Sequence, residues 1–443
     1  MVAPVTADAA TGANEIGPGI IRNPKIVLAL LTGLNLLNYI DRYVMAAVLP
    51  KVQKDLQLSN FMGGSLATIF LIGYFATSPI FGALSDRAGV GGRKRLMMVG
   101  VSVWSVATFA SGLVHGTMAL AAARAAVGVG EASYSTIAPT LIDDIATPEQ
   151  RARWMATFSA AMPIGSALGY VVGGAVEHNQ GWRAAFFVAG GPGLVLALLC
   201  LLIAEPVRRH SSGASAALFS SARSLLRIRG YRQTVLGCCA YTFAIGGFGY
   251  WAPKYLNARY GLEAGRASVT FGLLTVVGGF IGTMVGGWLA DRNVRRQAGR
   301  RDADPLDANA ADAIATRANL AVCALGVGLG APLAAAAIAA GEARTFFIVL
   351  IPCEIALFLS AGPVNVATLR SVPVELRATA MALLIFAIHL FGDLWSPLLI
   401  GLAADYAPMA WAMMAGPLFF ALAALVWGRG AVGAPGPPPA RLT

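Results

Sequence analysis

Long apolar stretches alternate with short polar segments along the whole chain. A helix needs about 20 mainly apolar residues to cross a bilayer. Twelve such spans can be delimited, at residues 26–49, 62–84, 96–114, 118–142, 152–176, 184–204, 233–256, 268–290, 318–340, 345–369, 378–402 and 408–428. The longest polar segments are 205–232 and 291–317, and the first divides the spans into six plus six. The pattern predicts an all-α membrane protein of twelve transmembrane helices in two six-helix bundles.

The same pattern divides the chain into five parts. We expect an N-terminal segment (1–25), a first bundle (26–204), a linker (205–232), a second bundle (233–428) and a disordered, Pro-rich tail (429–443). Residues 1–24 lack a basic start followed by an apolar core, so no cleaved signal peptide is expected. The linker has the pattern of an amphipathic helix on a membrane surface, through Arg208, Arg209, Arg223, Leu225, Leu226 and Arg227.

The basic residues are distributed unevenly between the two sides of the predicted membrane. Only 12% of the residues are charged, against about 25% in soluble domains, yet the net charge is +11. Loops on the side of the N-terminus carry 24 of the 33 Lys and Arg residues, and loops on the other side carry 7. Cytoplasmic loops are enriched in basic residues, so both termini and the linker are predicted to be cytoplasmic. This distribution explains the basic excess without a nucleic-acid partner.

Two short motifs recur at equivalent places in the two predicted bundles. The second and eighth spans end in similar motifs, Gly82-Ala-Leu-Ser-Asp86-Arg87 and Gly287-Trp-Leu-Ala-Asp291-Arg292. The fifth and eleventh spans also begin alike, with Glu149-Gln-Arg151 and Glu375-Leu-Arg377. Two pairs in the same orientation indicate a parallel duplication of a six-helix unit.

These motifs carry a family resemblance. The first, continued by Gly89 and Arg93-Lys94-Arg95, resembles the loop signature of the major facilitator superfamily, although Val90-Gly91-Gly92 delays its basic cluster. Two further stretches resemble the Spinster-type lipid transporters, Asn38-Tyr-Ile-Asp41-Arg42-Tyr43 and Gly128-Val-Gly-Glu131-Ala-Ser133-Tyr134. The resemblance covers nearly the whole chain. It implies that this protein has the fold of that superfamily and works by alternating access. It also implies that the protein is a bacterial homologue of the Spinster transporters and lies in the plasma (inner) membrane.

Charged residues inside the predicted spans are the sharpest functional signals, since each costs at least about 2.5–3.5 kcal/mol at the bilayer centre. The first span contains Asp41 and Arg42, and the fourth contains Arg124 and Glu131, seven residues apart and therefore nearly on one stripe. The resemblance implies that these two helices face the central cavity together. We expect the four residues to form a charge-balanced cluster.

The functional hypothesis for this cluster is proton coupling. Asp41 is the first candidate for the proton carrier and Glu131 the second, with Arg42 as counter-charge or anchor for an anionic headgroup. Substrate contacts are expected from this region as well, at Asn38, Arg42, Arg124, Glu131, Ser133 and Tyr134. The alternatives are permanent salt bridges, Asp41 with Arg42 or Arg124 with Glu131, or an Asp41 too near the outer interface to be buried.

A cytoplasmic gate is predicted from Gly82, Asp86, Arg87, Arg93 and Arg377. The resemblance implies that Asp86 pairs with a charge and a helix N-terminus near Arg377 when the cytoplasmic side is shut. A carboxylate at the positive end of a helix is favourable. For Arg93 to Arg95 the alternative is a basic loop that only sets topology.

The second bundle offers fewer charges. Glu354 lies in the tenth span, and His389 and Asp393 are spaced i, i+4 in the eleventh. Glu354 and His389 are candidates for substrate binding, and the His–Asp pair either relays protons or caps a kink near Pro397. Aromatic residues crowd the glycine-rich seventh span, which could bend, at Tyr241, Phe243, Phe248, Tyr250 and Trp251. They either guide an acyl chain or, for the last two, form an interfacial belt.

No His/Cys cluster indicates a metal, and no phosphate-binding loop indicates ATP use, so no cofactor is expected. The five cysteines fall in apolar stretches and are interpreted as small buried hydrophobes. We expect a monomeric, proton-coupled secondary transporter among membrane lipids. The resemblance alone implies its substrate, an amphipathic lipid such as a lysophospholipid or a sphingosine-phosphate-like compound. A multidrug or organic-solute antiporter is the alternative. A lipid-processing enzyme would need a nucleophile–base or metal constellation, and a channel would need a repeated pore ring; neither is apparent in the sequence.

Overall fold

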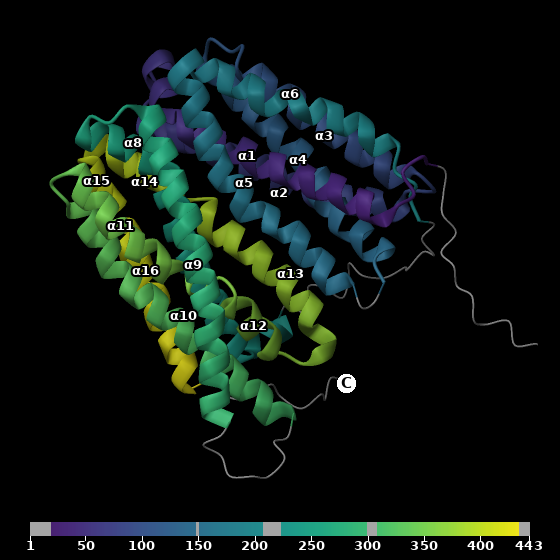
Figure 1. The fold of residues 1–443 in the computed structure, drawn as a ribbon, viewed down its shortest axis with the longest axis vertical. Helices are drawn as coiled ribbons and strands as arrows, with labels where there is room; N and C mark the ends of the chain where they lie inside the picture. The colour runs from purple at the N-terminus through teal and green to yellow at the C-terminus, as the bar shows by residue number, and fades with distance from the viewer. Residues whose placement is uncertain (1–18, 148–149, 207–222, 299–307, 434–443) are drawn as a thin grey trace, which may run out of the picture.

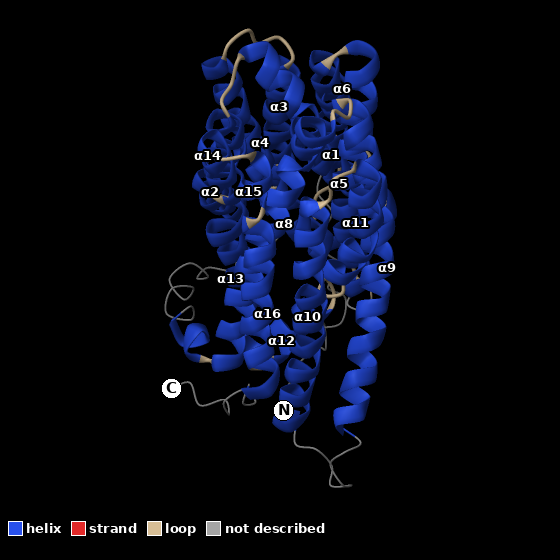
Figure 2. Cartoon of the chain, turned by 90° about the vertical axis from the view of Figure 1, so that its left-hand side faces the viewer, coloured by secondary structure: helices blue, strands red, loops and turns tan. Residues whose placement is uncertain are grey.

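The computed structural model describes residues 19–147, 150–206, 223–298 and 308–433. Within these ranges the chain consists of helices and the loops between them (Figure 2). Ile21 and Ile203 form an isolated backbone bridge. The all-α prediction is therefore confirmed.

Six continuous helices form the first bundle. They are α1 (Pro24–Leu56), α2 (Asn60–Arg87), α3 (Gly92–Ser111), α4 (Thr117–Ile145), α5 (Arg151–Gln180) and α6 (Trp182–Leu201). Each contains one of the first six predicted spans or most of it. The helices extend beyond the apolar spans because polar turns continue them into the loops. We call this part the N-bundle.

The second bundle, which we call the C-bundle, combines continuous and interrupted helices. They are α8 (Arg229–Tyr260), α9 (Ala264–Ala298), α10 (Ala308–Ala339), α11 (Ala343–Phe358) with α12 (Pro363–Arg370), a 3-10 turn (Val374–Leu376), α13 (Arg377–Ile388) with a π-helical turn (His389–Asp393) and α14 (Ser396–Tyr406), and α15 (Met409–Met413) with α16 (Ala415–Gly433). Grouped in this way, the described elements are consistent with twelve spans.

Proline explains where two of these interruptions fall. Pro363 begins α12 and Pro397 lies in the first turn of α14. A proline lacks the N–H that an interior helical position donates, but it is tolerated in a first turn. The helix is interrupted just before Pro397, as the kink alternative for the His389–Asp393 pair requires. The glycine-rich seventh span, in contrast, forms the unbroken helix α8.

The two bundles meet at one end and diverge at the other (Figure 1). The meeting end carries the C-terminus of α1 and the N-terminus of α2, and we call it the closed end. The opposite end, where α1 begins, α6 ends and α8 begins, we call the linker end. In the described part of the chain the main contacts across the bundles are those of α2 with α14 and of α5 with α9, and α1 also packs against α8 and α9.

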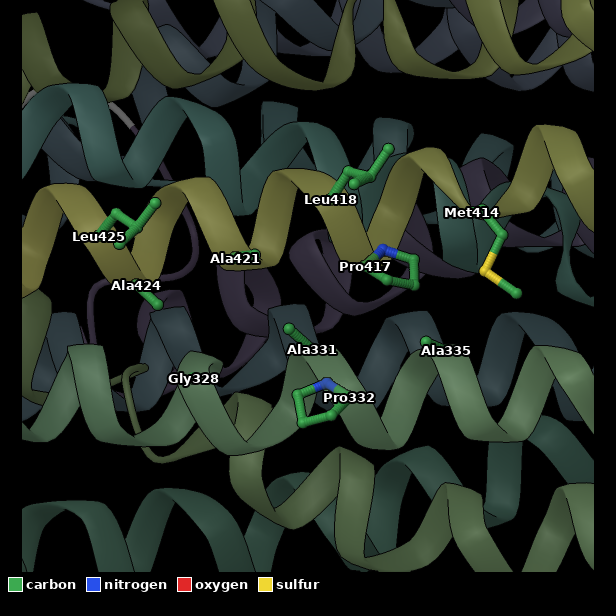
Figure 3. Close-up of a pocket in the computed structure, with 10 residues that line it drawn as sticks. All are labelled: Gly328, Ala331, Pro332, Ala335, Met414, Pro417, Leu418, Ala421, Ala424 and Leu425. Carbon is green, nitrogen blue, oxygen red and sulfur yellow. The ribbon is translucent and has the colours of Figure 1, made fainter.

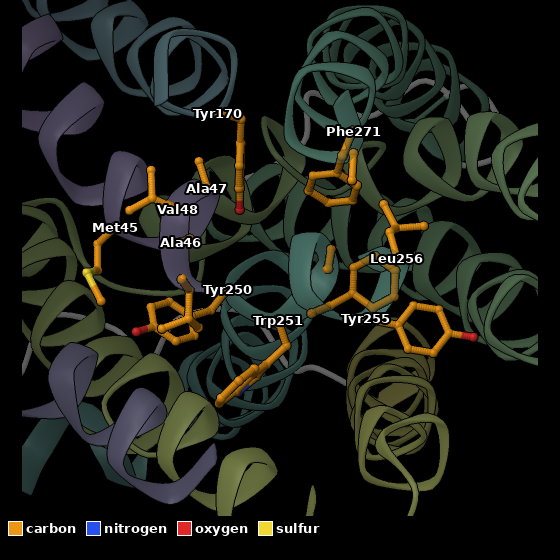
Figure 4. Packing of buried hydrophobic residues seen from close by; sticks show 14 of the residues in the cluster. Met45, Ala46, Ala47, Val48, Tyr170, Tyr250, Trp251, Tyr255, Leu256 and Phe271 are labelled. Atoms are coloured by element: carbon orange, nitrogen blue, oxygen red, sulfur yellow. The ribbon is translucent and has the colours of Figure 1, made fainter. Parts of the chain in front are cut away.

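Aromatic and aliphatic side chains of both bundles form one core at the closed end (Figure 4). Tyr250 and Trp251 of α8 are buried there, beside residues 45–48 of α1. The interfacial-belt alternative for these two aromatics is therefore wrong, because both side chains are inside the protein. The bundles also approach closely: a Cβ atom added at Gly174 would lie 2.6 Å from the carbonyl oxygen of Gly265.

Nine helices in the described part of the chain are long and apolar enough to span a membrane. The N-bundle helices α1, α3 and α4 are not among them. All three bury several polar or charged side chains, which lower their mean hydropathy. The helices that fail a purely hydrophobic criterion are thus those that hold the candidate charges or pack against them.

Some predicted boundaries shift. Residues 223–227 of the predicted linker are helical, as an amphipathic helix requires, and α8 begins at Arg229, inside the predicted linker. Arg208 and Arg209 lie outside the described residues, whereas Leu225 is buried in the C-bundle core. Helix α16 runs to Gly433, so the first five residues of the predicted tail are helical, and the rest lie outside the described residues. All five cysteines are free and buried, as expected.

Candidate functional site

Four charged side chains of α1 and α4 come together as two crossed ion pairs. Arg42 Nε lies 2.7 Å from Glu131 Oε2, and Arg124 Nη1 lies 3.7 Å from Asp41 Oδ1. The expected cluster is present, and Asp41 is buried. The ion pairs run between the helices and not within them, so the pairings named in the salt-bridge alternative differ from those observed, and the alternative of an exposed Asp41 is wrong.

The helix geometry explains the crossing. Neighbouring residues on an α-helix point about 100° apart, so Asp41 and Arg42 face different neighbours. Asp41 accepts a hydrogen bond from Thr108 of α3, whereas Arg42 lies against Phe70 and Tyr74 of α2. The long arginine side chains then reach across from one helix to the other.

The Asp41–Arg124 pair is loosely bonded. The oxygen Oδ1 of Asp41 and the nitrogens Nε and Nη1 of Arg124 are buried without a hydrogen bond, and so is Nδ2 of Asn38. Buried polar groups are nearly always hydrogen-bonded, so each exception calls for an explanation. Here the atoms of Asp41, Arg124 and Asn38 that lack a hydrogen bond lie in one region. A proton or a polar ligand that bound there could supply the missing hydrogen bonds.

Arg42 is held by aromatic rings as well as by its carboxylate. Its guanidinium carbon lies 5.2, 5.0 and 5.2 Å from the ring centroids of Tyr39, Phe70 and Tyr74. The Arg42 side chain is 16% exposed, while that of Glu131 is fully buried. Glu131 Oε1 has no hydrogen-bond partner. Arg42 is therefore the accessible cation of the cluster, and Thr108 and the three rings are partners that the sequence did not reveal.

Two predicted substrate residues are already engaged elsewhere in the N-bundle. Ser133 Oγ donates to the carbonyl of Leu96, 2.8 Å away, and the Tyr134 hydroxyl donates to the carbonyl of Leu31. Both side chains are fully buried. They tie α4 to α3 and α1, and we do not include them in the proposed site.

The C-bundle candidates lie apart from these ion pairs. Glu354 is buried and accepts a hydrogen bond from Thr275 Oγ1 at 3.4 Å. His389 Nδ1 lies 2.9 and 3.0 Å from the two carboxylate oxygens of Asp393, within the π-helical turn. The His389 ring also contacts Phe75 of the N-bundle, with centroids 5.8 Å apart. The pair therefore stands at a helix irregularity on the boundary between the bundles.

At the linker end the structure corrects the interpretation of the basic cluster. Arg93 is buried, with Nε 2.7 Å from Glu205 Oε1 and Nη1 2.5 Å from Asp144 Oδ2. Burial alone would lower the pKa of the Arg93 guanidinium, but hydrogen bonds to Glu205 and Asp144 raise it. Lys94 Nζ donates to the carbonyl of Ile203. These two residues tie α3 to the ends of α4 and α6, so they do more than set topology. Arg95 is exposed.

The other predicted gate residues stay within their own bundles or at the surface. Arg377 Nη2 lies 2.8 Å from Asp312 Oδ2, and its Nε donates to the carbonyl of Leu369. Asp86 and Arg87 are exposed at the end of α2, and Gly82 faces Thr136 of α4. The implied contact between Asp86 and the Arg377 region concerns a state in which this end is shut, and here the bundles diverge at this end.

Polar contacts between the bundles concentrate at the closed end. Lys254 Nζ of α8 donates to Gln53 Oε1 and Asn60 Oδ1, each at 2.6 Å. Asp405 of α14 accepts from the backbone N–H groups of Asn60 and Phe61 at 2.7 and 2.8 Å. A C-bundle carboxylate thus caps the N-terminus of α2, where the helix dipole favours negative charge. The structure is sealed at the closed end.

A groove of about 640 Å³ lies elsewhere, between α10 and α16 on the C-bundle (Figure 3). Its lining is entirely apolar, with Pro332 and Pro417 on facing helices. It contains none of the candidate charges and is not part of the site.

Comparisons with known proteins agree with this architecture. The family model for the Major Facilitator Superfamily matches residues 31–397. Protein spinster homolog 1 of Homo sapiens is 34% identical over 411 residues, covering 87% of this chain and 74% of its own. The protein of Arabidopsis thaliana named "Probable sphingolipid transporter spinster homolog 2" is 32% identical over 447 residues, covering 92% of this chain and 87% of its own. Protein spinster of Drosophila melanogaster is 32% identical, and the chain spans 62% of its length.

Solved structures show the same fold. A bacterial homolog to the human lysosomal transporter Spinster, in an inward-facing and unoccupied conformation, superposes with a TM-score of 0.77 at 21% identity, covering 94% of this chain and 98% of that chain. A D-xylose-proton symporter gives a TM-score of 0.69 at 19% identity, covering 91% and 97%. At these identities the likeness concerns the fold alone.

Proposed function

The chain belongs to the major facilitator superfamily and is a Spinster-type, multi-pass membrane transporter, and from this premise we propose that it moves an amphipathic lipid, such as a lysophospholipid or a sphingosine-phosphate-like compound, coupled to protons. The name of the Arabidopsis relative supports a lipid substrate. The proposed mechanism is alternating access, in which the bundles rock about the site.

The accessible Arg42 carries the substrate proposal. Its side chain is partly exposed, aromatic rings surround its guanidinium, and the fully buried Glu131 pairs with it. A guanidinium binds phosphate and carboxylate groups with paired hydrogen bonds. An anionic headgroup at Arg42 would compete with Glu131 and place its apolar chain beside Phe70 and Tyr74.

Asp41 is the proposed proton carrier. One of its oxygens accepts from Thr108, and the other faces Arg124 without a hydrogen bond. A proton on Asp41 would remove the attraction to Arg124 and so loosen α1 from α4. Coupling requires the proton to bind the two conformations with different affinity, and a loose pair between two helices supports the proposal, because movement of either helix would change the attraction between Asp41 and Arg124.

The proposed orientation places the linker end in the cytoplasm, following the excess of basic residues on that side. The bundles then diverge on the cytoplasmic side (Figure 1) and are joined on the outer side by the Lys254 and Asp405 contacts. We place the protein in the plasma membrane of a bacterium and expect it to act as a monomer.

The test is uptake of labelled lysophospholipid by liposomes containing the purified protein, with and without a pH gradient. Albumin extraction removes lipid that stays in the outer leaflet, and protein-free liposomes give the background. We expect uptake several-fold above background, with a rate that depends on the gradient. Transport of organic cations with no lysophospholipid uptake would instead favour the multidrug antiporter.

A further inference from the structure

Helices α9 and α10 form a second, smaller groove toward the linker end. Its volume is about 220 Å³. The lining includes Leu289, Arg292, Asn293 and Arg296 of α9 and Val322 and Leu325 of α10. Asn293 Nδ2 donates to the carbonyl of Ala318 at 3.0 Å, which fixes the two helices side by side.

Two arginines stand at the mouth of this groove. Arg292 and Arg296 are one helical turn apart, on the same face of α9, and both are exposed. Like charges at this spacing destabilise a helix. Within the described part of the chain, neither guanidinium forms an ion pair with a carboxylate. The charge at the mouth therefore suits an anionic ligand.

Apolar side chains continue from the arginines toward the middle of the helices. Leu289 and Val322 form the floor, and half of the Leu325 surface is exposed. Trp288 is also exposed, and the Arg292 guanidinium lies 5.2 Å from its ring centroid. Tryptophan is enriched at the interface between lipid headgroups and acyl chains. Arg296 and Leu289 are separated by about 10 Å along the helix, so the groove has a cationic end and an apolar end.

We propose that this groove binds an anionic phospholipid of the surrounding leaflet, with its phosphate between Arg292 and Arg296 and an acyl chain along Trp288, Leu289 and Leu325. Basic pockets between transmembrane helices on the cytoplasmic side are suited to such headgroups. Paired guanidinium groups match the geometry of a phosphate. The bound lipid is a resident of the C-bundle surface and not the transported cargo, so the site does not depend on what the protein carries.

The test measures lipid preference by fluorescence. Full-length protein is placed in bilayers that contain phosphatidylglycerol or phosphatidylcholine with brominated chains, which quench nearby tryptophan. The Trp288→Phe variant identifies the signal from the groove. We expect phosphatidylglycerol to quench that signal preferentially, and the Arg292→Gln/Arg296→Gln variant to lower the preference by about tenfold or more. Arg295→Gln, an exposed neighbour outside the groove, is the matched control and should keep the preference.

Three results would overturn the proposal. The first is an equal quenching by both lipids in the unaltered protein. The second is a loss of preference in Arg295→Gln as large as in the double variant, which would indicate a general basic surface. The third is displacement of the brominated lipid by millimolar inorganic phosphate, which would indicate a site for a free anion. None of these measurements involves transport, so the proposed lipid transport can fail or succeed independently.

Discussion

The two bundles treat their buried carboxylates differently. In the N-bundle, Asp41 and Glu131 each face an arginine of another helix. In the C-bundle, Glu354 has a single hydroxyl partner, Thr275, and in the described part of the chain no salt bridge. The two bundles thus share the same arrangement of helices but differ in the partners of their buried carboxylates. A proton or headgroup that bound at Asp41 or Glu131 would therefore change contacts between helices, whereas a proton on Glu354 would break no ion pair.

The linker end shows a second contrast, in the sign of the charges. Arg93 at the start of α3 binds two carboxylates, Asp144 and Glu205. At the equivalent place in the C-bundle, Asp312 at the start of α10 binds two arginines, Arg370 and Arg377. Each bundle therefore joins the ends of its helices through a cluster of three charges. One cation binds two anions in the N-bundle, and one anion binds two cations in the C-bundle. The ion pairs of both clusters join residues of one bundle and do not cross to the other bundle.

The largest expected effect comes from Arg42→Gln. The substitution leaves the fully buried Glu131 without its counter-charge, which costs about 3–5 kcal/mol. We expect liposome uptake to fall by about a hundredfold or more and the melting temperature in detergent to drop. The double variant Arg42→Gln/Glu131→Gln should recover the stability, because no charge is stranded, but not the uptake. Normal uptake by either variant would remove Arg42 from the substrate site.

The next effect concerns the proton. Asn at position 41 can still accept from Thr108 but cannot carry a proton at neutral pH. In the Asp41→Asn variant we expect uptake under a pH gradient to fall by about tenfold, to the rate without a gradient. The protein should also lose stability, because the buried Arg124 loses its counter-charge. Thr108→Val is the control, since it removes the hydrogen bond and keeps the charge, and its response to the gradient should persist. An Asp41→Asn protein with full rate and unchanged pH dependence would end the proton-carrier proposal.

A third prediction compares the two clusters at the linker end. Arg93 is 2% exposed, and its loss leaves the buried Glu205 unpaired, so Arg93→Gln should destabilise the protein by about 3 kcal/mol. The side chains of Arg370 and Arg377 are 50% and 24% exposed. Water can therefore replace their carboxylate, and Asp312→Asn should cost about 1 kcal/mol. Thermal unfolding in detergent measures both, with the exposed Arg95→Gln as a control that should change little. If Asp312→Asn destabilised the protein more than Arg93→Gln, burial would not determine how much each cluster stabilises the protein.

The sequence predicted the architecture because the bilayer imposes one length and one polarity on every span. Few charges occur within the spans, which singled out Asp41, Arg42, Arg124 and Glu131, and the family resemblance implied that their two helices face each other. The sequence could not predict which acid pairs with which base, because long arginine side chains reach either partner and the choice depends on side-chain direction. The role of Arg93 was missed for a related reason: its partner Glu205 is 112 residues away, and only the packed helices bring them together.

The smallest effect is expected in the C-bundle, at Glu354. Glutamine has the shape of glutamate and can accept the hydrogen bond from Thr275, and no guanidinium loses a partner. Uptake by Glu354→Gln should therefore stay within about threefold of the unaltered protein, and its response to the pH gradient should be the same. Thr275→Val, which removes the hydroxyl instead, separates a packing effect from a charge effect. If Glu354→Gln abolished the pH response as Asp41→Asn is expected to do, proton coupling would extend across both bundles. The crossed ion pairs of the N-bundle and the lone carboxylate of the C-bundle would then differ in their partners but not in whether they take part in proton coupling.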